Sequence, residues 1–296
     1  MRVVLTGSSG RVGRAIYGAL VPEHDVIGVD RNVFSTTHVI GDCGDAELMK
    51  RVCEGADAII HTAGPHAPHV GLVPDAEFER INIEATRSLY EIAQNCGARR
   101  FLYTSTTALY AHAIEPGACT WVTEETEPRP RTIYHRTNLA AERLLQELAN
   151  EDCPVRALRM SRCFPEPADI MATYRLHRGI DARDVANGHV LALNHEGKPF
   201  GRFILSGHSP FAQSDCAALA HDAELVLRER APELAAIFDA RGWALPQAID
   251  RVYAPTKAMK ELGWRPRFGW DEVIRQADRA DLEVLPVCAL GSSARE

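Results

Sequence analysis

Short apolar runs alternate with segments of helical periodicity over the first 160 residues of the chain. Most of these runs are apolar throughout, which is typical of strands that are covered on both faces of a sheet. The predicted strands are "RVVLTG" (2–7), "DVIGVD" (25–30), "HVIGD" (38–42), "AIIHTAG" (58–64), "RFLYTST" (100–106) and "VRALRM" (155–160).

Segments with apolar residues at helical spacing separate the predicted strands. They are "GRVGRAIYGALV" (10–21), "DAELMKRVCEG" (45–55), "DAEFERINIEATRSLYEIAQNCG" (75–97) and "YHRTNLAAERLLQELANE" (134–151). Alternation of strands and helices with short turns predicts an α/β fold, a doubly wound parallel Rossmann sheet with helices on both sides.

After residue 160 the pattern loosens. The stretch 162–179 contains prolines and is expected to be irregular, and "RFILSG" (202–207) reads as a strand. Helical patterns cover 181–196, 214–238 and parts of 254–282, and the tail "LGSSARE" (290–296) is expected to fray. We therefore expect a Rossmann domain over 1–160, to which 180–205 returns, and a smaller mixed C-terminal substrate lobe from 161–179 and 206–296.

Composition and charge narrow the class of protein. A hydrophobic content of 46% allows a sizeable core, while a net charge of −7 without a basic run argues against a nucleic-acid partner. No apolar run approaches the roughly 18 residues of a membrane helix. The start "MRVVLTG" reads as a strand from residue 2 and leaves no room for a signal peptide, so we expect a cytoplasmic protein.

Cysteines and histidines do not suggest a metal site. The eight cysteines form no C-x-x-C pair, which favours scattered reduced thiols. His61, His66 and His69 lie close together in "HTAGPHAPH", but their spacing matches no zinc pattern. We predict no metal.

A glycine-rich loop joins the first predicted strand to the first helix. Gly7, Gly10 and Gly13 have the spacing G-x-x-G-x-x-G, which lets a pyrophosphate approach the backbone at a helix N-terminus. Asp30 ends the next strand, where a carboxylate can bind both ribose hydroxyls and favours NAD because it repels a 2′-phosphate. Arg31 could soften this preference, which makes NADP the less favoured alternative. Asp42 could read an adenine edge or lie in a solvated turn.

Several motifs in order resemble the extended short-chain dehydrogenase/reductase family, the group that holds NAD-dependent sugar epimerases and dehydratases. The resemblance covers residues 1 to about 275. The matching segments are "TGSSGRVG", "IIHTAG", "INIEAT", "FLYTSTTALY", "HRGIDARDVANGHVLAL" and "APTKAMKELGWRPR".

The resemblance implies a cofactor site and a hydride-transfer site. Implied cofactor-binding residues are Gly7, Ser9, Gly10, Arg11, Val12, Gly13, Asp30, Asp42, Thr62, Ala63, Gly64, Asn82, Thr104, Tyr134 and Asn138. Thr106, with Ser105 as the less favoured alternative, would hold the substrate oxygen, and Tyr134 would be the general acid/base. The family's Lys, which binds the nicotinamide ribose and lowers the pKa of the Tyr, would sit at position 138, where this chain has Asn.

Asn138 removes the charge that such a Tyr would use. The pKa of a free Tyr is near 10. A Tyr that acts as a base at neutral pH therefore needs its pKa lowered by roughly 3 units, which corresponds to about 4 kcal/mol. His135 and Arg136 follow at positions that do not share the helix face of Tyr134. Three explanations stay open. The chain is an enzyme that works with fewer catalytic groups, in the direction of carbonyl reduction; or it is a cofactor-binding protein that has lost turnover; or it carries an engineered Lys→Asn change.

The segment after residue 160 is expected to form the substrate lobe over the carboxyl ends of the strands. Arg175, His177 and Arg178 in "YRLHRG" could bind a pyrophosphate or be solvated loop charges, and His66 could line the site near the nicotinamide.

We expect an NAD-dependent oxidoreductase or epimerase that acts on a secondary alcohol or ketone of a sugar-like small molecule, with a non-catalytic dinucleotide-binding regulator as the alternative. The small lobe favours an oxidoreductase over an epimerase. Segments 78–94 and 140–149 could form a homodimer contact, or their apolar stripes could face the sheet.

Overall fold

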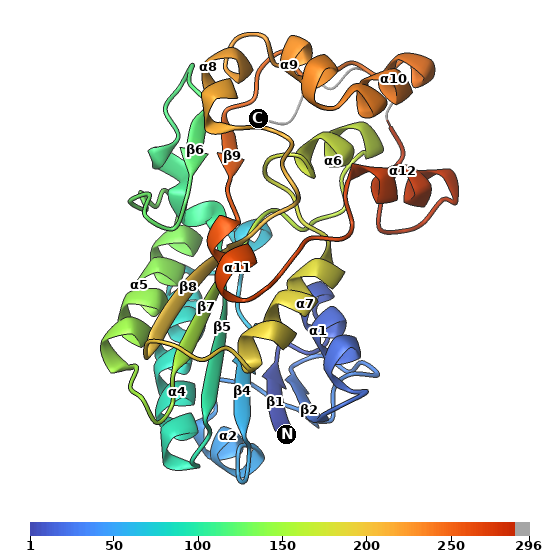
Figure 1. Cartoon of the computed structure of the whole chain (residues 1–296). Coiled ribbons are helices and arrows are strands. Elements are labelled where there is room, and N and C mark those ends of the chain that lie inside the picture. Colours follow the sequence, from blue (N-terminus) through green and yellow to red (C-terminus); the bar gives the residue numbers. More distant parts are fainter. Residues whose placement is uncertain (288–296) are drawn as a thin grey trace.

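A parallel sheet of seven strands forms the lower half of the molecule (Figure 1). The computed structural model describes residues 1–287, so the tail predicted to fray lies outside this range. The strand order is β3-β2-β1-β4-β5-β7-β8, and every neighbouring pair is parallel. The strands are β1 (Arg2–Thr6), β2 (Asp25–Asp30), β3 (Val39–Ile40), β4 (Ala58–His61), β5 (Arg100–Thr106), β7 (Val155–Met160) and β8 (Phe200–Leu205). The predicted fold class is confirmed.

Helices cover both faces of the sheet, as the apolar strands require. One face packs against α1 (Arg11–Leu20), α7 (Ala182–Leu193) and α11 (Thr256–Glu261). The other packs against α2 (Ala46–Val52), α4 (Thr86–Asn95) and α5 (Ile133–Leu148). The buried stripes of α4 and α5 therefore face the sheet, the second of the two arrangements expected for them.

The long helical pattern over 75–97 is divided by a π-helical turn. It contains α3 (Asp75–Glu79), the π turn η2 (Arg80–Ala85) and α4. Such turns insert one residue into the helix and are frequent at functional sites. Here the turn carries Asn82, which is buried and lines the cleft described below.

The smaller lobe lies above the carboxyl ends of the strands (Figure 1). It contains the helices α6 (Ala168–Tyr174), α8 (Cys216–Leu219), α9 (Ala223–Arg230), α10 (Pro232–Arg241) and α12 (Trp270–Asp278), and the parallel strands β6 (Thr120–Val122) and β9 (Arg251–Tyr253). The 3₁₀ turns are η1 (Ala67–His69), η3 (Thr107–Ala113) and η4 (Gln213–Asp215).

The lobe differs from the sequence expectations in two places and adds detail in a third. The stretch 162–179 is not irregular throughout, because α6 forms after Pro167 and its Met171 and Ala172 join the core of the lobe. The helical pattern over 214–238 is confirmed but divided into η4, α8, α9 and α10, and one break falls at Pro232, which cannot donate the hydrogen bond that a continuous helix needs. β6 and β9 were not predicted, because three residues are too few for a readable alternation.

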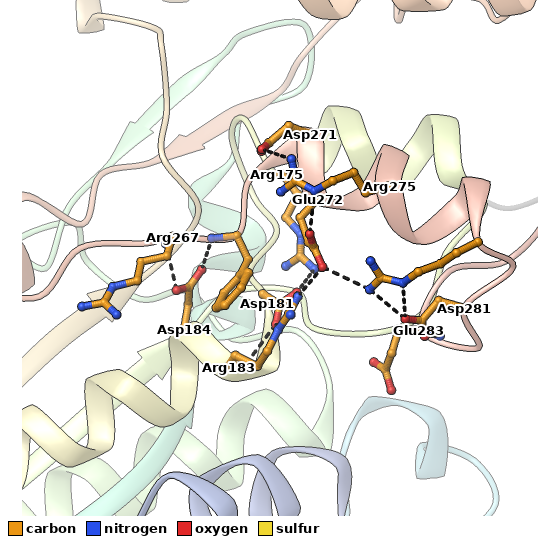
Figure 2. Close-up of polar contacts among 12 residues, drawn as sticks. Arg175, Asp181, Arg183, Asp184, Arg267, Asp271, Glu272, Arg275, Asp281 and Glu283 are labelled. Carbon is orange, nitrogen blue, oxygen red and sulfur yellow. Dashed lines mark hydrogen bonds and ion pairs between the residues drawn. The ribbon is translucent and has the colours of Figure 1, made fainter.

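A polar junction joins the lobe to the sheet domain (Figure 2). Asp181 caps α7 and pairs with buried Arg175 at 3.1 Å, while Arg183 reaches Glu272 of α12 at 3.2 Å. Asp184 accepts hydrogen bonds from the backbone N–H groups of residues 267 and 268 at 2.9 and 3.0 Å. These contacts hold α12 and the segment before it against the start of α7. Among the described residues, no helix is long and apolar enough to cross a membrane.

Candidate active site

One cleft of about 870 Å³ runs along the carboxyl ends of the strands and under the lobe. Its cofactor end is defined here as the loop 7–13, Asp30 and the segment 62–64, and its substrate end as residues 162–164, 178 and 251. Of the cofactor-binding and catalytic residues that the resemblance implies, all but Asp42 line this cleft.

The glycine loop lies close against the end of β4. Gly7 has a φ of +74°, and a Cβ there would lie 2.5 Å from Thr62 Oγ1. A Cβ on Gly13 would lie 2.0 Å from the carbonyl oxygen of Gly7. Gly10 is the N-cap of α1, and no side chain caps this helix end. The backbone N–H groups of the first turn thus remain available to an anion, which the helix dipole also favours.

Asp30 lies at the end of β2 and fixes the loop next to it. Its Oδ2 accepts from the Ser9 N–H at 3.0 Å, and its Oδ1 accepts from the Asn32 N–H at 2.9 Å. Each oxygen keeps a further lone pair for a ribose hydroxyl. Arg31 lines the cleft, but its guanidinium pairs with Asp42 at 2.7 Å and Glu77 at 2.9 Å. The arginine that could have accommodated a 2′-phosphate is therefore already held by two carboxylates.

Asp42 does not lie in the cleft wall, unlike its neighbours Gly41 and Cys43. Its carboxylate accepts from the Gly44 N–H and from Arg80, both at 2.8 Å, in addition to Arg31. Partial burial raises the pKa of Asp42, but these hydrogen bonds outweigh it and hold the pKa below its ordinary value. The side chain thus orders the turn after β3 and does not line the cleft.

The segment after β4 is held by side chains that sequence reasoning assigned only in part. The Thr62 hydroxyl donates to the Thr6 carbonyl at 2.8 Å. Asn82 donates to Thr137 Oγ1 of α5 at 3.0 Å, and a Cβ on Gly64 would lie 2.4 Å from the Asn82 side-chain oxygen. Asn82 therefore fixes the cleft wall, because it packs between Gly64 and α5.

His61 is bound through both ring nitrogens within the sheet domain. It is buried between Thr6 and Thr86, with ring nitrogens 2.7 and 3.0 Å from their hydroxyls. Burial lowers the pKa of His61 to about 4, so the ring is neutral.

The ends of β5 and α5 bring together the predicted catalytic hydroxyls. Thr106 ends β5, and Tyr134 lies in the first turn of α5, which Thr132 caps. Burial raises the pKa of Tyr134, and a hydrogen bond with Thr106 opposes this shift. Ser105 is buried and donates to Glu142, so its hydroxyl is engaged and Thr106 is the one that meets Tyr134.

Asn138 is bound at both ends of its amide. Its Nδ2 donates to the Tyr134 carbonyl at 2.8 Å, and its Oδ1 accepts from the Tyr103 hydroxyl at 2.9 Å. Sequence reasoning missed Tyr103; the available signal was its place on β5 directly before the hydroxyl-rich "TST". Burial raises the pKa of Tyr103 well above its ordinary value, so it stays a neutral donor. Asn138 thus forms a neutral hydrogen-bonded link between the Tyr134 backbone and the Tyr103 hydroxyl.

Neither His135 nor Arg136 supplies a positive charge to the Tyr134 hydroxyl. The His135 Nδ1 accepts from the backbone N–H groups of Arg131 and Thr132 at 3.2 and 3.4 Å and so caps α5. Burial lowers the pKa of His135 to about 4. Arg136 is exposed and donates to the Arg131 carbonyl.

Thr104 has a partner that the motifs did not reveal. Its hydroxyl lies 2.8 Å from His189 Nε2, while His189 Nδ1 donates to the Val185 carbonyl at 2.8 Å. Burial lowers the pKa of His189 to about 4, so the neutral ring accepts from Thr104. The lone pairs of the Thr104 hydroxyl remain available in the cleft wall.

The segment "YRLHRG" is neither a cluster around a pyrophosphate nor a solvated loop. Arg175 is 2% exposed and pairs with Asp181, and His177 is 4% exposed and bonds the Arg251 carbonyl at 2.9 Å. Only Arg178 lines the cleft. His66 lies in the cleft wall as well, stacked on Phe164 with ring centroids 5.8 Å apart.

Proteins that are similar to this chain in sequence include two that are named as sugar dehydrogenases. An NAD-dependent glucose-6-phosphate dehydrogenase of Haloferax volcanii is 29% identical over 165 residues, which cover 48% of this chain and 60% of that protein. The chain thus spans less than two thirds of this relative's length.

Two solved structures share the fold. A short-chain dehydrogenase/reductase superfamily protein from Agrobacterium tumefaciens with bound NAD superimposes with a TM-score of 0.72 at 20% identity, covering 95% of this chain and 97% of that one. The UDP-N-acetylglucosamine 4-epimerase from Bacillus cereus gives 0.70 at 18% identity, covering 95% and 98%. Residues 3–168, more than half of the chain, match the NAD-dependent epimerase/dehydratase family, and the chain belongs to this family.

Proposed function

We propose that this chain is an NAD-dependent oxidoreductase that interconverts a secondary alcohol and a ketone on a sugar-like small molecule. One observation carries the proposal: Thr106 and Tyr134 meet in the same cleft that holds the glycine loop and Asp30. The Haloferax volcanii relative, a sugar dehydrogenase by name, supports net oxidation or reduction over epimerisation.

The residues of the cofactor end fit NAD. The uncapped first turn of α1 and the close glycine backbone would hold the pyrophosphate, and Asp30 would bind the adenosine ribose. Asn138 and Thr104 would contact the nicotinamide half. When bound, NAD supplies the hydride donor or acceptor.

The protein's own residues would handle the substrate oxygen. Thr106 and Tyr134 would hold it by hydrogen bonds, and Tyr134 would give its phenol proton to that oxygen during reduction. The raised pKa of Tyr134 keeps the phenol protonated at neutral pH, which suits an acid. In the oxidation direction the phenol must first lose this proton, so oxidation should speed up as the pH rises toward the raised pKa.

Removal of one oxygen atom tests the proposal. Tyr134→Phe should lower kcat for the reduction of a carbonyl substrate by about 10²- to 10⁴-fold, because the acid is lost, while NADH affinity changes little. A panel of sugar-derived ketones and aldehydes, followed by NADH consumption, identifies the substrate. Tyr17→Phe is the control, since it removes a hydroxyl outside the cleft.

The alternative, a non-catalytic dinucleotide sensor, has a different outcome. The chain would then bind NADH without consuming it with any panel substrate, and Asn138→Lys would not restore turnover.

A further inference from the structure

Two cysteines from distant parts of the chain meet in the lobe. Cys119 lies directly before β6, and Cys216 is the first residue of α8. Their side chains share a hydrogen bond in which the Cys119 thiol is the donor and the Cys216 sulfur the acceptor. Both cysteines are free and half-buried, so they keep some contact with solvent.

Main-chain hydrogen bonds hold the two cysteine-bearing segments together. The Thr120 N–H donates to the Asp250 carbonyl at 2.8 Å, which places the start of β6 beside residue 250. The preceding residue, Ile249, donates its N–H to the Leu219 carbonyl at 2.7 Å at the end of α8. Leu219 lies one helical turn after Cys216. Both segments therefore lie against the same short stretch of backbone, and the contact of the thiols does not depend on side-chain rotamers alone.

A second group of thiols, in the sheet domain, shows what is particular about this pair. Cys53, Cys96 and Cys153 are close enough for their charges to interact. Cys53 and Cys153 are fully buried in the core, however, and the Cys96 thiol donates to the Ala93 carbonyl at 3.4 Å. The proton of Cys96 is thus directed at the backbone, whereas that of Cys119 is directed at another sulfur.

The two thiols of the pair differ in how readily they lose a proton. Burial raises the pKa of both, and the hydrogen bond adds to this shift at Cys119 but opposes it at Cys216. Cys216 is therefore the thiol that ionises first, and the thiolate is the form that attacks a disulfide. The raised pKa makes this attack slow at neutral pH. It also leaves the reduced pair without the thiolate stabilisation that would oppose disulfide formation.

The pair lies next to a two-stranded ribbon that carries part of the cleft wall. β6 and β9 pair with Thr120 opposite Arg251 and Val122 opposite Tyr253. Arg251 and Tyr253 both line the cleft, and the Tyr253 hydroxyl donates to the Thr107 carbonyl at 3.4 Å. A covalent bond between the start of this ribbon and α8 would thus restrain one wall of the substrate end.

We propose that Cys119 and Cys216 form a reversible disulfide when the chain meets a low-molecular-weight disulfide such as oxidised glutathione. The Cys216 thiolate attacks one sulfur of the oxidant and releases one glutathione thiolate. Cys119 then loses its proton and attacks the Cys216 sulfur, which releases the second glutathione thiolate. The protein gives up two protons and two electrons, and the oxidant becomes two thiols. Neither cysteine lines the cleft, so the inference is independent of the proposed function.

Incubation of the reduced chain in glutathione buffers of increasing oxidised fraction tests the inference. Free thiols are alkylated afterwards, and peptide mass mapping locates any disulfide. We expect a cross-link between the Cys119 and Cys216 peptides that dithiothreitol reverses. Its rate of formation should rise about 10-fold per pH unit below the pKa of Cys216, because the thiolate fraction rises by that factor. Alkylation of both thiols at every glutathione ratio would overturn the inference, as would a preferred disulfide between other cysteines.

Variants distinguish this disulfide from unrelated oxidation. In Cys119→Ser, the Cys216 thiol should stop at a mixed disulfide with glutathione, because the thiol that resolves it is missing. Cys96→Ser is the matched control, since it removes a half-buried thiol of the other group and should keep the cross-link. A cross-link that persisted in Cys119→Ser, or that was lost in Cys96→Ser, would contradict the assignment.

Thermal unfolding reports the restraint that the disulfide places on the lobe. The cross-link closes a loop of about 100 residues, so oxidation should raise the Tm by about 5 °C or more. The same rise is expected in Cys96→Ser and none in Cys119→Ser. Equal Tm values for oxidised and reduced wild type would refute the restraint. None of these readouts uses NADH consumption, so their failure and the failure of the proposed function are distinguishable.

Discussion

At the cofactor end the cleft wall offers mostly backbone atoms, whereas at the substrate end it offers side chains. Gly7 and Gly13 leave no room for a Cβ, and the first turn of α1 leaves its N–H groups uncapped. The wall of the substrate end contains the long side chains of Arg162, Arg178 and Arg251, which come from three segments.

This difference bears on how each end can change. A backbone site needs particular residues at fixed spacing, so it leaves a readable motif. A side-chain site can be assembled from any elements that the fold brings together. Substitutions at the two ends should therefore fail in different ways.

The largest expected effect is that of Gly13→Ala. The new Cβ would lie 2.0 Å from the Gly7 carbonyl oxygen, so the loop backbone must move. We expect NADH affinity to fall by about 100-fold or more, because the pyrophosphate needs this close approach. Fluorescence titration with NADH measures the loss.

Gly18→Ala is the matched control for this change. It lies in the same helix and its Cβ would meet nothing within 4 Å. It should keep NADH affinity and stabilise the fold by about 0.5–1 kcal/mol, which thermal unfolding reports. If Gly13→Ala bound NADH like the wild type, the backbone account of the cofactor end would be wrong.

The next effect concerns Asp30→Asn, which removes the charge but keeps the shape. Loss of charge-assisted hydrogen bonds to the ribose, about 1.5–3 kcal/mol, should weaken NADH by about 10- to 100-fold. NADPH should lose less, because the carboxylate no longer repels its 2′-phosphate. Parallel titrations with both cofactors check this, with exposed Asp152→Asn as the charge-matched control.

Equal losses for NADH and NADPH in Asp30→Asn would argue against a role of its charge in cofactor choice.

The smallest of the three effects is expected for Asn138→Lys, at a position between the two ends of the cleft. This change should act on the pH dependence of the reaction. A lysine ammonium next to Tyr134 favours the phenolate, so the raised pKa of the phenol should fall. The limb of the oxidation pH profile that rises with pH should therefore move to lower pH by about 1–3 units. Initial rates against pH with the substrate from the panel measure this shift.

Exposed Asn95→Lys adds the same charge far from Tyr134 and should leave the profile in place. A profile that also stays unchanged in Asn138→Lys would show that Tyr134 does not set the pH dependence.

Much of the cofactor end was readable in the sequence. The glycine spacing, Asp30 and the strand-end motifs predicted residues that do line one cleft, because each of these signals is local. Asp42 was the exception, since its engagement depends on Arg80, which is 38 residues away in the chain. The same limit hid Tyr103 and His189, whose roles are set by partners on other elements.

The substrate end could not be read in this way. Arg175, His177 and Arg178 are close in sequence, but the tertiary structure buries the first two and leaves only the third in the cleft. Arg251 carried no signal, because β9 is three residues long and pairs with β6, more than a hundred residues earlier.

The sequence by itself determined the α/β sheet, the phosphate loop and the position of Tyr134 with Asn138, because hydrophobic period, glycine spacing and helix register are properties of short segments. Only the tertiary structure decided which charges face the cleft and which are neutralised, since burial and ion pairing join residues far apart in the chain. Among these are the link from Tyr103 to Asn138 and the pairing of Arg178 and Arg251 with Asp250 at the substrate end of the cleft.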